Sequence, residues 1–271
     1  MNNAQNQESW NTISKSYQRE NRISLEDVHY GPVAPGEREL GLLGDVKGKR
    51  ILELGCGGGQ NSIVLTKWGA EVVGLDISEI QLEQANLLAK KEGVKVEFIQ
   101  GRMENLSQLN DDNFDIVLSS HAIGYADDLK TVFMETVRVL KPEGFLVFCL
   151  EHPIWITVGI ALEDGDLKKV RNYFDSSRNI WDWKCFDGTK ATFNQGDWSI
   201  AEIINGLIET GLQIVRIEEP QAYDIANMDA KAISKIPFIS NVKDWYQEYV
   251  NKFVRVTRII PFSMIVKAKK P

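Results

Sequence analysis

The chain has 271 residues and a formal net charge of −7 at pH 7, which suits one large domain and disfavours a general nucleic-acid surface. Its three scattered cysteines form no CxxC pair, so the sequence indicates neither a disulfide framework nor a bound metal. Without a signal-peptide pattern or a run of about 18 apolar residues, we expect a cytoplasmic protein that does not span a membrane.

Residues 1–47 are predicted to form a helical N-terminal segment. Trp10, Ile13 and Tyr17 are spaced by three and four residues, which places them on one face of a helix. Pro32 and Pro35 then interrupt the pattern.

Residues 48–152 alternate between strand and helix patterns. Short apolar runs ending in glycine or polar residues are typical of buried parallel strands. Ser78, with Gln81 three residues later, predicts a capping box at the start of a helix that Gly93 ends. The predicted strands are 50–55, 70–78, 94–101, 115–120 and 145–152, the predicted helices are 60–69, 78–93 and 127–140, and "KPEG" at 141–144 is a turn.

The alternation stops after His152. Residues 153–198 hold four of the seven tryptophans without a clear period, and we expect them to form a cap inserted after the fifth strand. Residues 199–271 complete the sheet with a helix at 199–211 and strands at 212–220 and 253–270, around an irregular stretch from about 221 to 252.

This order predicts one α/β domain over residues 1–271. Alternating strands and helices indicate a doubly wound, Rossmann-like, mostly parallel sheet of seven strands, with a helical N-terminal segment and a cap. Ligands of such sheets bind at the carboxyl ends of the strands.

The segment "ILELGCGGGQNS" at 51–62 joins the first of these strands to a helix through four glycines. Gly55 and Gly57 match the first two glycines of the dinucleotide-binding pattern, but Gln60 takes the place of the third. No Gly-Lys-Ser/Thr follows, so the loop is not a P-loop. Because Asp76 ends the next strand about twenty residues on, its carboxylate can accept hydrogen bonds from ribose hydroxyls.

These residues resemble the class I S-adenosylmethionine-dependent methyltransferases. The resemblance rests on "ILELGCGGG" and "VVGLDIS", and extends through "GRMENL", "FDIVLSSHAI" and "VLKPEGFLVF", which covers about residues 48 to 152. It implies S-adenosylmethionine as the cofactor and S-adenosylhomocysteine as the product.

The resemblance also implies roles for individual residues. Gly55 and Gly57 let the backbone approach the methionine part of the cofactor, Glu53 supports the loop, Asp76 holds the ribose and Ile77 packs on the adenine. Further positions implied by the resemblance are Met103 at the adenine and the backbone carbonyl of Ser119 or Ser120 at the amino group of the cofactor. Tyr17 is implied as a cover, although it could equally be a core aromatic residue.

One position departs from the family pattern. Arg102 follows Gly101 where many relatives have an acid that contacts the adenine amino group. A guanidinium cannot accept a hydrogen bond, so we expect the backbone N–H of Met103 to contact the adenine instead.

A methyl acceptor that must lose a proton requires a base. His121 and His152 follow the fourth and fifth predicted strands, so both are candidates at the ligand-binding edge, although either could simply pack there. Glu151 could be a base, orient His152 or face water.

We therefore expect methyl transfer to a small-molecule acceptor, with nucleic acid an unfavoured partner and a homodimer left open. Alternatives are a tRNA-modifying methyltransferase, a nicotinamide oxidoreductase and a non-catalytic S-adenosylmethionine-binding protein. The tryptophans of 153–198 would line the acceptor pocket or fill a separate small cap.

Overall fold

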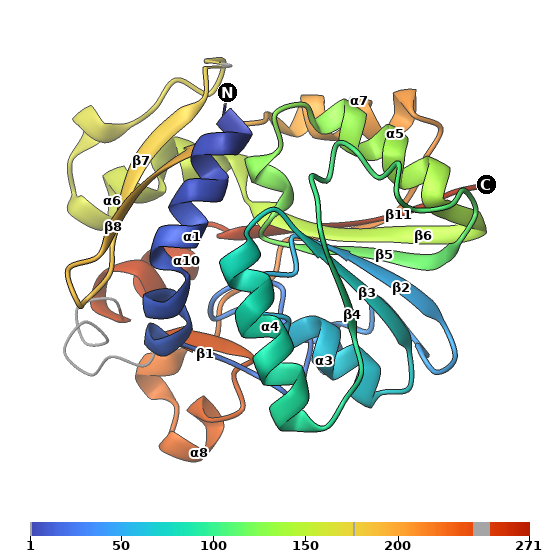
Figure 1. The fold of residues 1–271 in the computed structure, drawn as a ribbon. Coiled ribbons are helices and arrows are strands. Elements are labelled where there is room, and N and C mark those ends of the chain that lie inside the picture. Colours follow the sequence, from blue (N-terminus) through green and yellow to red (C-terminus); the bar gives the residue numbers. More distant parts are fainter. Residues whose placement is uncertain (1, 176, 241–249) are drawn as a thin grey trace.

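The computed structural model describes residues 2–175, 177–240 and 250–271. Its centre is a seven-stranded sheet with the strand order β4-β3-β2-β5-β6-β11-β9 (Figure 1). These strands are β2 (Arg50–Leu54), β3 (Glu71–Asp76), β4 (Glu97–Gln100), β5 (Phe114–Ser120), β6 (Leu140–Glu151), β9 (Gln213–Glu218) and β11 (Ser263–Lys269).

The sheet is mostly parallel. β4, β3, β2, β5 and β6 run parallel to one another, whereas β11 lies antiparallel between β6 and β9. The carboxyl ends of the five parallel strands therefore meet at one edge. The predicted doubly wound, seven-stranded α/β fold is confirmed.

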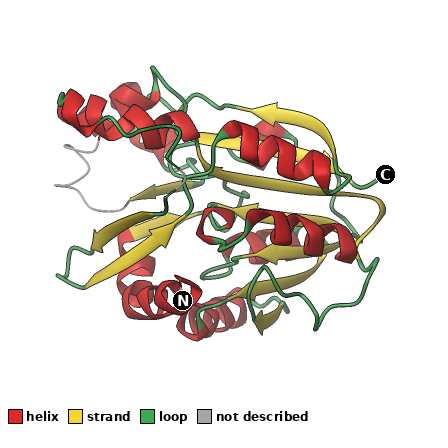
Figure 2. Cartoon of the chain, turned by 90° about the horizontal axis from the view of Figure 1, so that it is seen from above, coloured by secondary structure: helices red, strands yellow, loops and turns green. Residues whose placement is uncertain are grey.

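Helices cover both faces of the sheet, as Figures 1 and 2 show. The α-helices are α1 (Asn2–Glu20), α2 (Glu37–Leu40), α3 (Gln60–Lys67), α4 (Glu79–Glu92), α5 (Leu129–Val139), α6 (Ile160–Asp164), α7 (Ile200–Glu209), α8 (Ala230–Ile233) and α10 (Arg255–Thr257). Single turns of 3₁₀- or π-helix are η1 (Ile123–Tyr125), η2 (Trp155–Gly159), η3 (Leu167–Lys169), η4 (Ile225–Asn227) and η5 (Val250–Val254).

The side chains of each central strand alternate between the two faces of the sheet, and a hydrophobic core lies against each face. Leu52 of β2 points into one core with Phe133 of α5 and Leu207 of α7, whereas Ile51 points into the other with Leu65 of α3. Successive side chains of a strand face opposite sides, so a strand covered on both faces must be apolar throughout. This requirement explains the continuous apolar runs in the sequence.

Two local predictions need correction. Ser78 does cap α4 by accepting the backbone N–H of Gln81, but the side chain of Gln81 turns away toward α1 instead of closing the predicted capping box. Residues 253–270 are not one strand, because η5 and α10 occupy the first part and β11 begins only at Ser263.

The "KPEG" segment at 141–144 lies within β6 rather than before it. It contains a register shift against β5, and Glu143 has a φ of 68°. The predicted turn is therefore an irregularity in a longer strand, stabilised by backbone hydrogen bonds to Lys270.

Two small ribbons lie beside the carboxyl edge. β7 (Asn179–Lys184) and β8 (Lys190–Gln195) form a hairpin, and β1 (Asn21–Ile23) pairs with β10 (Phe238–Ser240). The hairpin packs along α1, as seen on the left of Figure 1. Residues 241–249, in the stretch predicted to be irregular, lie outside the described residues. No described helix is long and apolar enough to cross a membrane.

Candidate functional site

The glycine loop between β2 and α3 is shaped by three left-handed residues. Gly55, Gly57 and Gly59 have φ values of 70°, 53° and 78°. A Cβ on Gly55 would lie 2.2 Å from the Cβ of Ala122, whereas a Cβ on Gly57 would meet only the amide of Gln81, at 3.9 Å. Gly55 is therefore required by protein packing, and Gly57 borders open space.

Asp76 holds this loop against the neighbouring strand. It is 8% exposed, and its carboxylate accepts the backbone N–H groups of Gly57 at 2.8 Å and Ser78 at 2.9 Å. Burial raises the pKa of Asp76 while these backbone hydrogen bonds lower it. The carboxylate has further lone pairs available for a ligand in the adjoining cavities.

Glu53 is buried under the same loop. It accepts a short hydrogen bond from the hydroxyl of Ser62, at the start of α3. Burial raises the pKa of Glu53 to about 7. The side chain thus links β2 to the helix and also lines the cavity in front of the loop.

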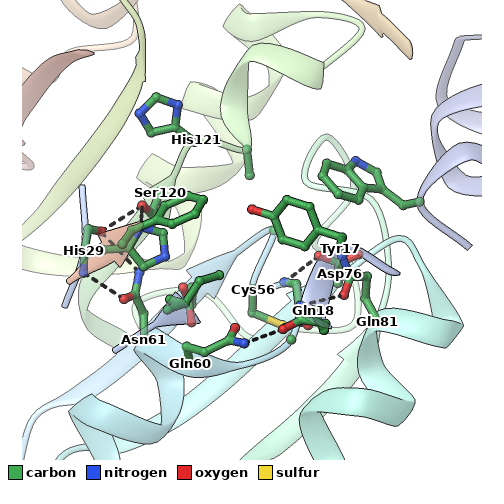
Figure 3. Close-up of a pocket in the computed structure, with 18 of the residues that line it drawn as sticks. Tyr17, Gln18, His29, Cys56, Gln60, Asn61, Asp76, Gln81, Ser120 and His121 are labelled. Carbon is green, nitrogen blue, oxygen red and sulfur yellow. Dashed lines mark hydrogen bonds between the residues drawn. The ribbon is translucent and has the colours of Figure 1, made fainter. Parts of the chain in front are cut away.

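Three cavities lie along the carboxyl edge, and the first two flank the glycine loop. The loop cavity has a volume of about 640 Å³ and is bordered by the glycines, Asp76, Ser120 and His121 (Figure 3). The Met103 cavity, of about 440 Å³, is bordered by Asp76, Ile77, Arg102 and Met103.

The third cavity, which we call the aromatic chamber, measures about 630 Å³. Seven aromatic side chains line it together with Glu151 and Gln195. The aromatic residues are Trp10, Tyr17, Tyr125, Trp181, Trp183, Phe238 and Phe262.

The three cavities are neighbours that share lining residues. Trp10 and Tyr125 border all of them, while Asp76 is common to the Met103 and loop cavities and His121 is common to the loop cavity and the aromatic chamber. The arrangement can hold an extended ligand across the glycine loop and a second molecule beside it.

Helix α1 covers the loop through a polar network. Gln18 accepts a hydrogen bond from Gln60 at 2.6 Å and donates one to Gln81 at 3.2 Å (Figure 3). Ser14 also donates to Gln81, at 3.0 Å, and Ser78 donates to Asn11 at 2.6 Å. The helix whose apolar stripe was predicted from Trp10, Ile13 and Tyr17 is thus joined to both the glycine loop and α4.

Comparison with known proteins identifies the family. Residues 52–148 match the model of the methyltransferase domain family. An uncharacterized protein of Haemophilus influenzae is 33% identical over 221 residues, which are 76% of this chain and 82% of that protein. The chain belongs to the class I S-adenosylmethionine-dependent methyltransferases. Its cofactor is therefore S-adenosylmethionine, and the predicted enzyme class is confirmed.

Other relatives match a smaller share of the chain or only its fold. A ubiquinone biosynthesis O-methyltransferase of Aliivibrio fischeri is 34% identical over 101 residues, and the match spans 37% of this chain and 43% of that protein. A solved S-adenosylmethionine-dependent methyltransferase from Mesorhizobium loti has a TM-score of 0.56 at 22% identity, covering 85% of this chain and 94% of that one. The second likeness shows the fold alone.

The structure separates the two serines at the end of β5 in this methyltransferase. Ser120 lines the loop cavity, where its hydroxyl donates to the backbone carbonyl of His29 at 2.8 Å. Ser119 lines none of the three cavities, and its hydroxyl donates to the carbonyl of Leu54 at 3.0 Å. Alternation along the strand turns one side chain to the ligand edge and buries the other.

His121 lies where the loop cavity meets the aromatic chamber. Its ring stacks on Phe262, with centroids 5.6 Å apart, and its Nε2 is 3.0 Å from the hydroxyl of Ser263. Burial lowers its pKa to about 4, against a smaller opposing contribution from a hydrogen bond with the Tyr30 backbone. The imidazole is neutral at physiological pH.

His152 is not brought to the cavities. Its Nδ1 accepts the backbone N–H of Ile154 at 3.0 Å, and its Nε2 is 2.6 Å from a carboxylate oxygen of Glu219. Burial is the largest cause of its lowered pKa. Both ring nitrogens have protein partners, and His152 borders none of the three cavities.

Sequence reasoning missed several residues of the site. His29 lines the loop cavity beside Ser120, and burial lowers the pKa of His29 to about 3. Phe238 of β10 lines the same cavity, although it comes about 210 residues later in the chain than His29. Gln18 and Gln60 close the loop. Of these residues, only Gln60 was marked by the sequence, because it is a polar residue at the position where the dinucleotide-binding pattern has its third glycine.

Arg102 is accounted for by ion pairs. It borders the Met103 cavity and contacts Asp127 at 3.2 Å and Glu104 at 3.6 Å. The residue that departs from the family pattern thus ties two neighbouring loops together. Met103 and Ile77 remain in this cavity as its apolar lining.

Proposed function

We propose that this methyltransferase transfers the methyl group of S-adenosylmethionine to a small-molecule acceptor held in the aromatic chamber. The observation that carries the proposal is that three neighbouring cavities with shared lining residues lie beside the glycine loop. A polymeric substrate would favour a basic surface, whereas the net charge is −7 and the chamber wall is mainly aromatic.

The residues present fit the cofactor. Asp76 would accept the ribose hydroxyls, Ile77 and Met103 would pack on the adenine, and the open face of Gly57 would admit the methionine part, with Glu53, Ser120 and the loop around it. The bound cofactor would supply a sulfonium methyl group that an acceptor lone pair can attack in line, with S-adenosylhomocysteine as the leaving group.

The chain's own contribution is alignment and exclusion of water. Tyr17 and Trp10 of α1 close the junction of the cavities, and the aromatic walls offer a dry surface to the acceptor. Holding two reactants in a near-attack geometry supplies much of the acceleration of such displacements. His121 is the histidine at this junction, and we propose it as the base for an acceptor that must lose a proton.

Two measurements test this function. Calorimetry should show that the purified chain binds S-adenosylmethionine. A labelled-methyl assay should then place the label in the low-molecular-weight fraction of a metabolite extract. Label in RNA instead would support the tRNA-modifying alternative, and tight binding without transfer to any fraction would support a non-catalytic cofactor-binding protein.

A further inference from the structure

Glu151 is the single carboxylate among the described residues that line the aromatic chamber. It ends β6 and accepts a hydrogen bond from the side chain of Gln195 at 3.2 Å. Burial, with a smaller contribution from the charge of Asp197, raises its pKa to about 6. Glu151 is partly buried, so at neutral pH the chamber contains a carboxylate that is mainly anionic and only partly exposed to solvent.

No cationic side chain among the described residues shares the chamber with this anion. The lining contains no lysine or arginine, and its histidine, His121, is neutral. The nearby Asp197, in contrast, has a cationic partner, because it forms an ion pair with Arg171 at 2.5 Å. A carboxylate removed from water without a cationic partner is costly, and a bound cation would offset that cost.

Four of the rings that line the chamber with Glu151 contact one another, and we call this group the cage. Tyr17 lies edge-on to Trp10 and to Trp183, at centroid distances of 5.4 Å and 5.3 Å, and Trp181 is 5.5 Å from Trp183. α1 and β7 hold these four rings. The face of an aromatic ring attracts cations, and cages of several rings recognise alkylated ammonium groups.

We propose that the aromatic chamber takes an acceptor that carries a positively charged nitrogen centre, with Glu151 as its counter-ion and the rings of α1 and β7 as its cage. The proposal rests on the chamber being the acceptor site of the proposed function. It names Glu151 as a specificity-determining residue, and uncharged acceptors of the same shape would bind less well.

The test uses the full chain saturated with S-adenosylhomocysteine, with choline as the probe. The control ligand is the uncharged isostere of choline, in which a tert-butyl group replaces trimethylammonium. Because Trp10, Trp181 and Trp183 border the chamber, tryptophan fluorescence reports binding of either ligand. Choline should bind about tenfold or more tightly than its isostere.

Substitution assigns the preference to a residue. Glu151→Gln keeps the shape and the contact with Gln195, and should remove most of the preference for choline while leaving the isostere unaffected. The matched control is Glu163→Gln, because Glu163 is another partly buried glutamate with a pKa raised to about 7, and it borders none of the three cavities.

The pH dependence of choline binding provides a second test. Choline binding should strengthen as pH rises through about 6, because Glu151 then becomes anionic. The other titratable groups of the chamber are silent in that range, since the pKa of His121 is about 4 and burial raises those of Tyr17 and Tyr125. Asp197, with a pKa of about 6, does titrate there, so Glu151→Gln must abolish the effect.

Four results would overturn the proposal: equal affinity for the two ligands, no binding of either, an unchanged preference in Glu151→Gln, or displacement of choline by S-adenosylhomocysteine. If Glu151→Gln does not fold, Trp181→Leu replaces it and should weaken choline more than the isostere. Calorimetry with S-adenosylmethionine is run on the same protein preparations before S-adenosylhomocysteine is added. Normal cofactor binding without a choline preference would refute this inference and leave the proposed function standing.

Discussion

At the scale of single residues, Asp76 has the clearest expected effect. Asp76→Ala should weaken S-adenosylmethionine binding by about 1.5–3 kcal/mol, the scale of charge-assisted hydrogen bonds lost from a buried carboxylate. It also removes the acceptor for the N–H of Gly57, so the loop loses a support. Calorimetry should show no change for Glu71→Ala, which alters the exposed beginning of the same strand. Unchanged affinity in folded Asp76→Ala would contradict the assignment.

Gly57 can be tested against a glycine of similar conformation. Gly57→Ala and Gly41→Ala both place a Cβ on a left-handed residue, with φ values of 53° and 61°, and both should lower stability by about 1–2 kcal/mol. A Cβ on Gly41, at the end of α2, would meet no atom within 4 Å. Titration calorimetry should show a large loss of cofactor affinity for Gly57→Ala alone. Equal affinities of the two variants would make the loop a structural turn.

His121 has a pH signature that differs from the one expected of an ordinary histidine. The sequence predicts an ionisation near pH 6.5, but burial lowers the pKa to about 4, so any rise in rate caused by its deprotonation is complete below neutrality. His121→Ala should reduce turnover by about 10²–10⁴-fold if it is the base, with cofactor affinity nearly constant.

The control for that experiment is His152→Ala. Because His152 faces Glu219 and the Ile154 backbone instead of a cavity, its loss should affect stability more than turnover. Rates are compared at saturating cofactor once an acceptor is known. Near-normal turnover in both variants would leave alignment as the whole basis of catalysis.

At the scale of elements, we expect α1 to control access to the cofactor. Gln18→Ala removes the contacts with Gln60 and Gln81 that join this helix to the loop and to α4. Release of S-adenosylhomocysteine should accelerate several-fold, because covers of this kind often limit product release. Stopped-flow tryptophan fluorescence measures the rate.

Thr12→Ala is the matched control on the same helix. The hydroxyl of Thr12 donates to the carbonyl of Glu8 within α1, in an exposed hydrogen bond. Its replacement should leave the release rate unchanged. A release rate in Gln18→Ala equal to that of Thr12→Ala would show that the polar network does not hold the helix closed.

At the scale of the whole molecule, Glu53 should shape the dependence of stability on pH. Its pKa is about 7 in the folded chain, against 4.5 for an unperturbed glutamate, so between these limits the folded state holds a proton that the unfolded state has lost. Stability therefore falls with rising pH, by about 1.4 kcal/mol per unit from this group.

Glu53→Gln should remove that part of the slope. Denaturant unfolding at several pH values between the two limits measures the difference between the variant and the unaltered chain. Glu163 also has a pKa raised to about 7 and lies at an unrelated position, so Glu163→Gln serves for comparison. Parallel stability curves for Glu53→Gln and the unaltered chain would show that Glu53 is already ionised in the fold.

The sequence by itself determined the sheet and the family. Apolar runs such as that of β2 need burial on both faces, glycines such as Gly55 mark a left-handed turn, and Asp76 ends the next strand. These signals are local, because they depend on strand periodicity and backbone conformation. They predicted the strand and helix order of the core and placed Gly57, Asp76, Ile77 and Met103 where the structure shows cavities.

Only the tertiary structure decided which polar and aromatic side chains share the site. His121 and His152 follow adjacent strands in the same way, yet one borders the cavities and the other binds Glu219. Of the four tryptophans in 153–198, Trp181 and Trp183 line the chamber, whereas Trp155 packs with Phe253. The physical reason is that these positions depend on contacts between segments distant in the chain, and spacing along the sequence carries no record of such contacts.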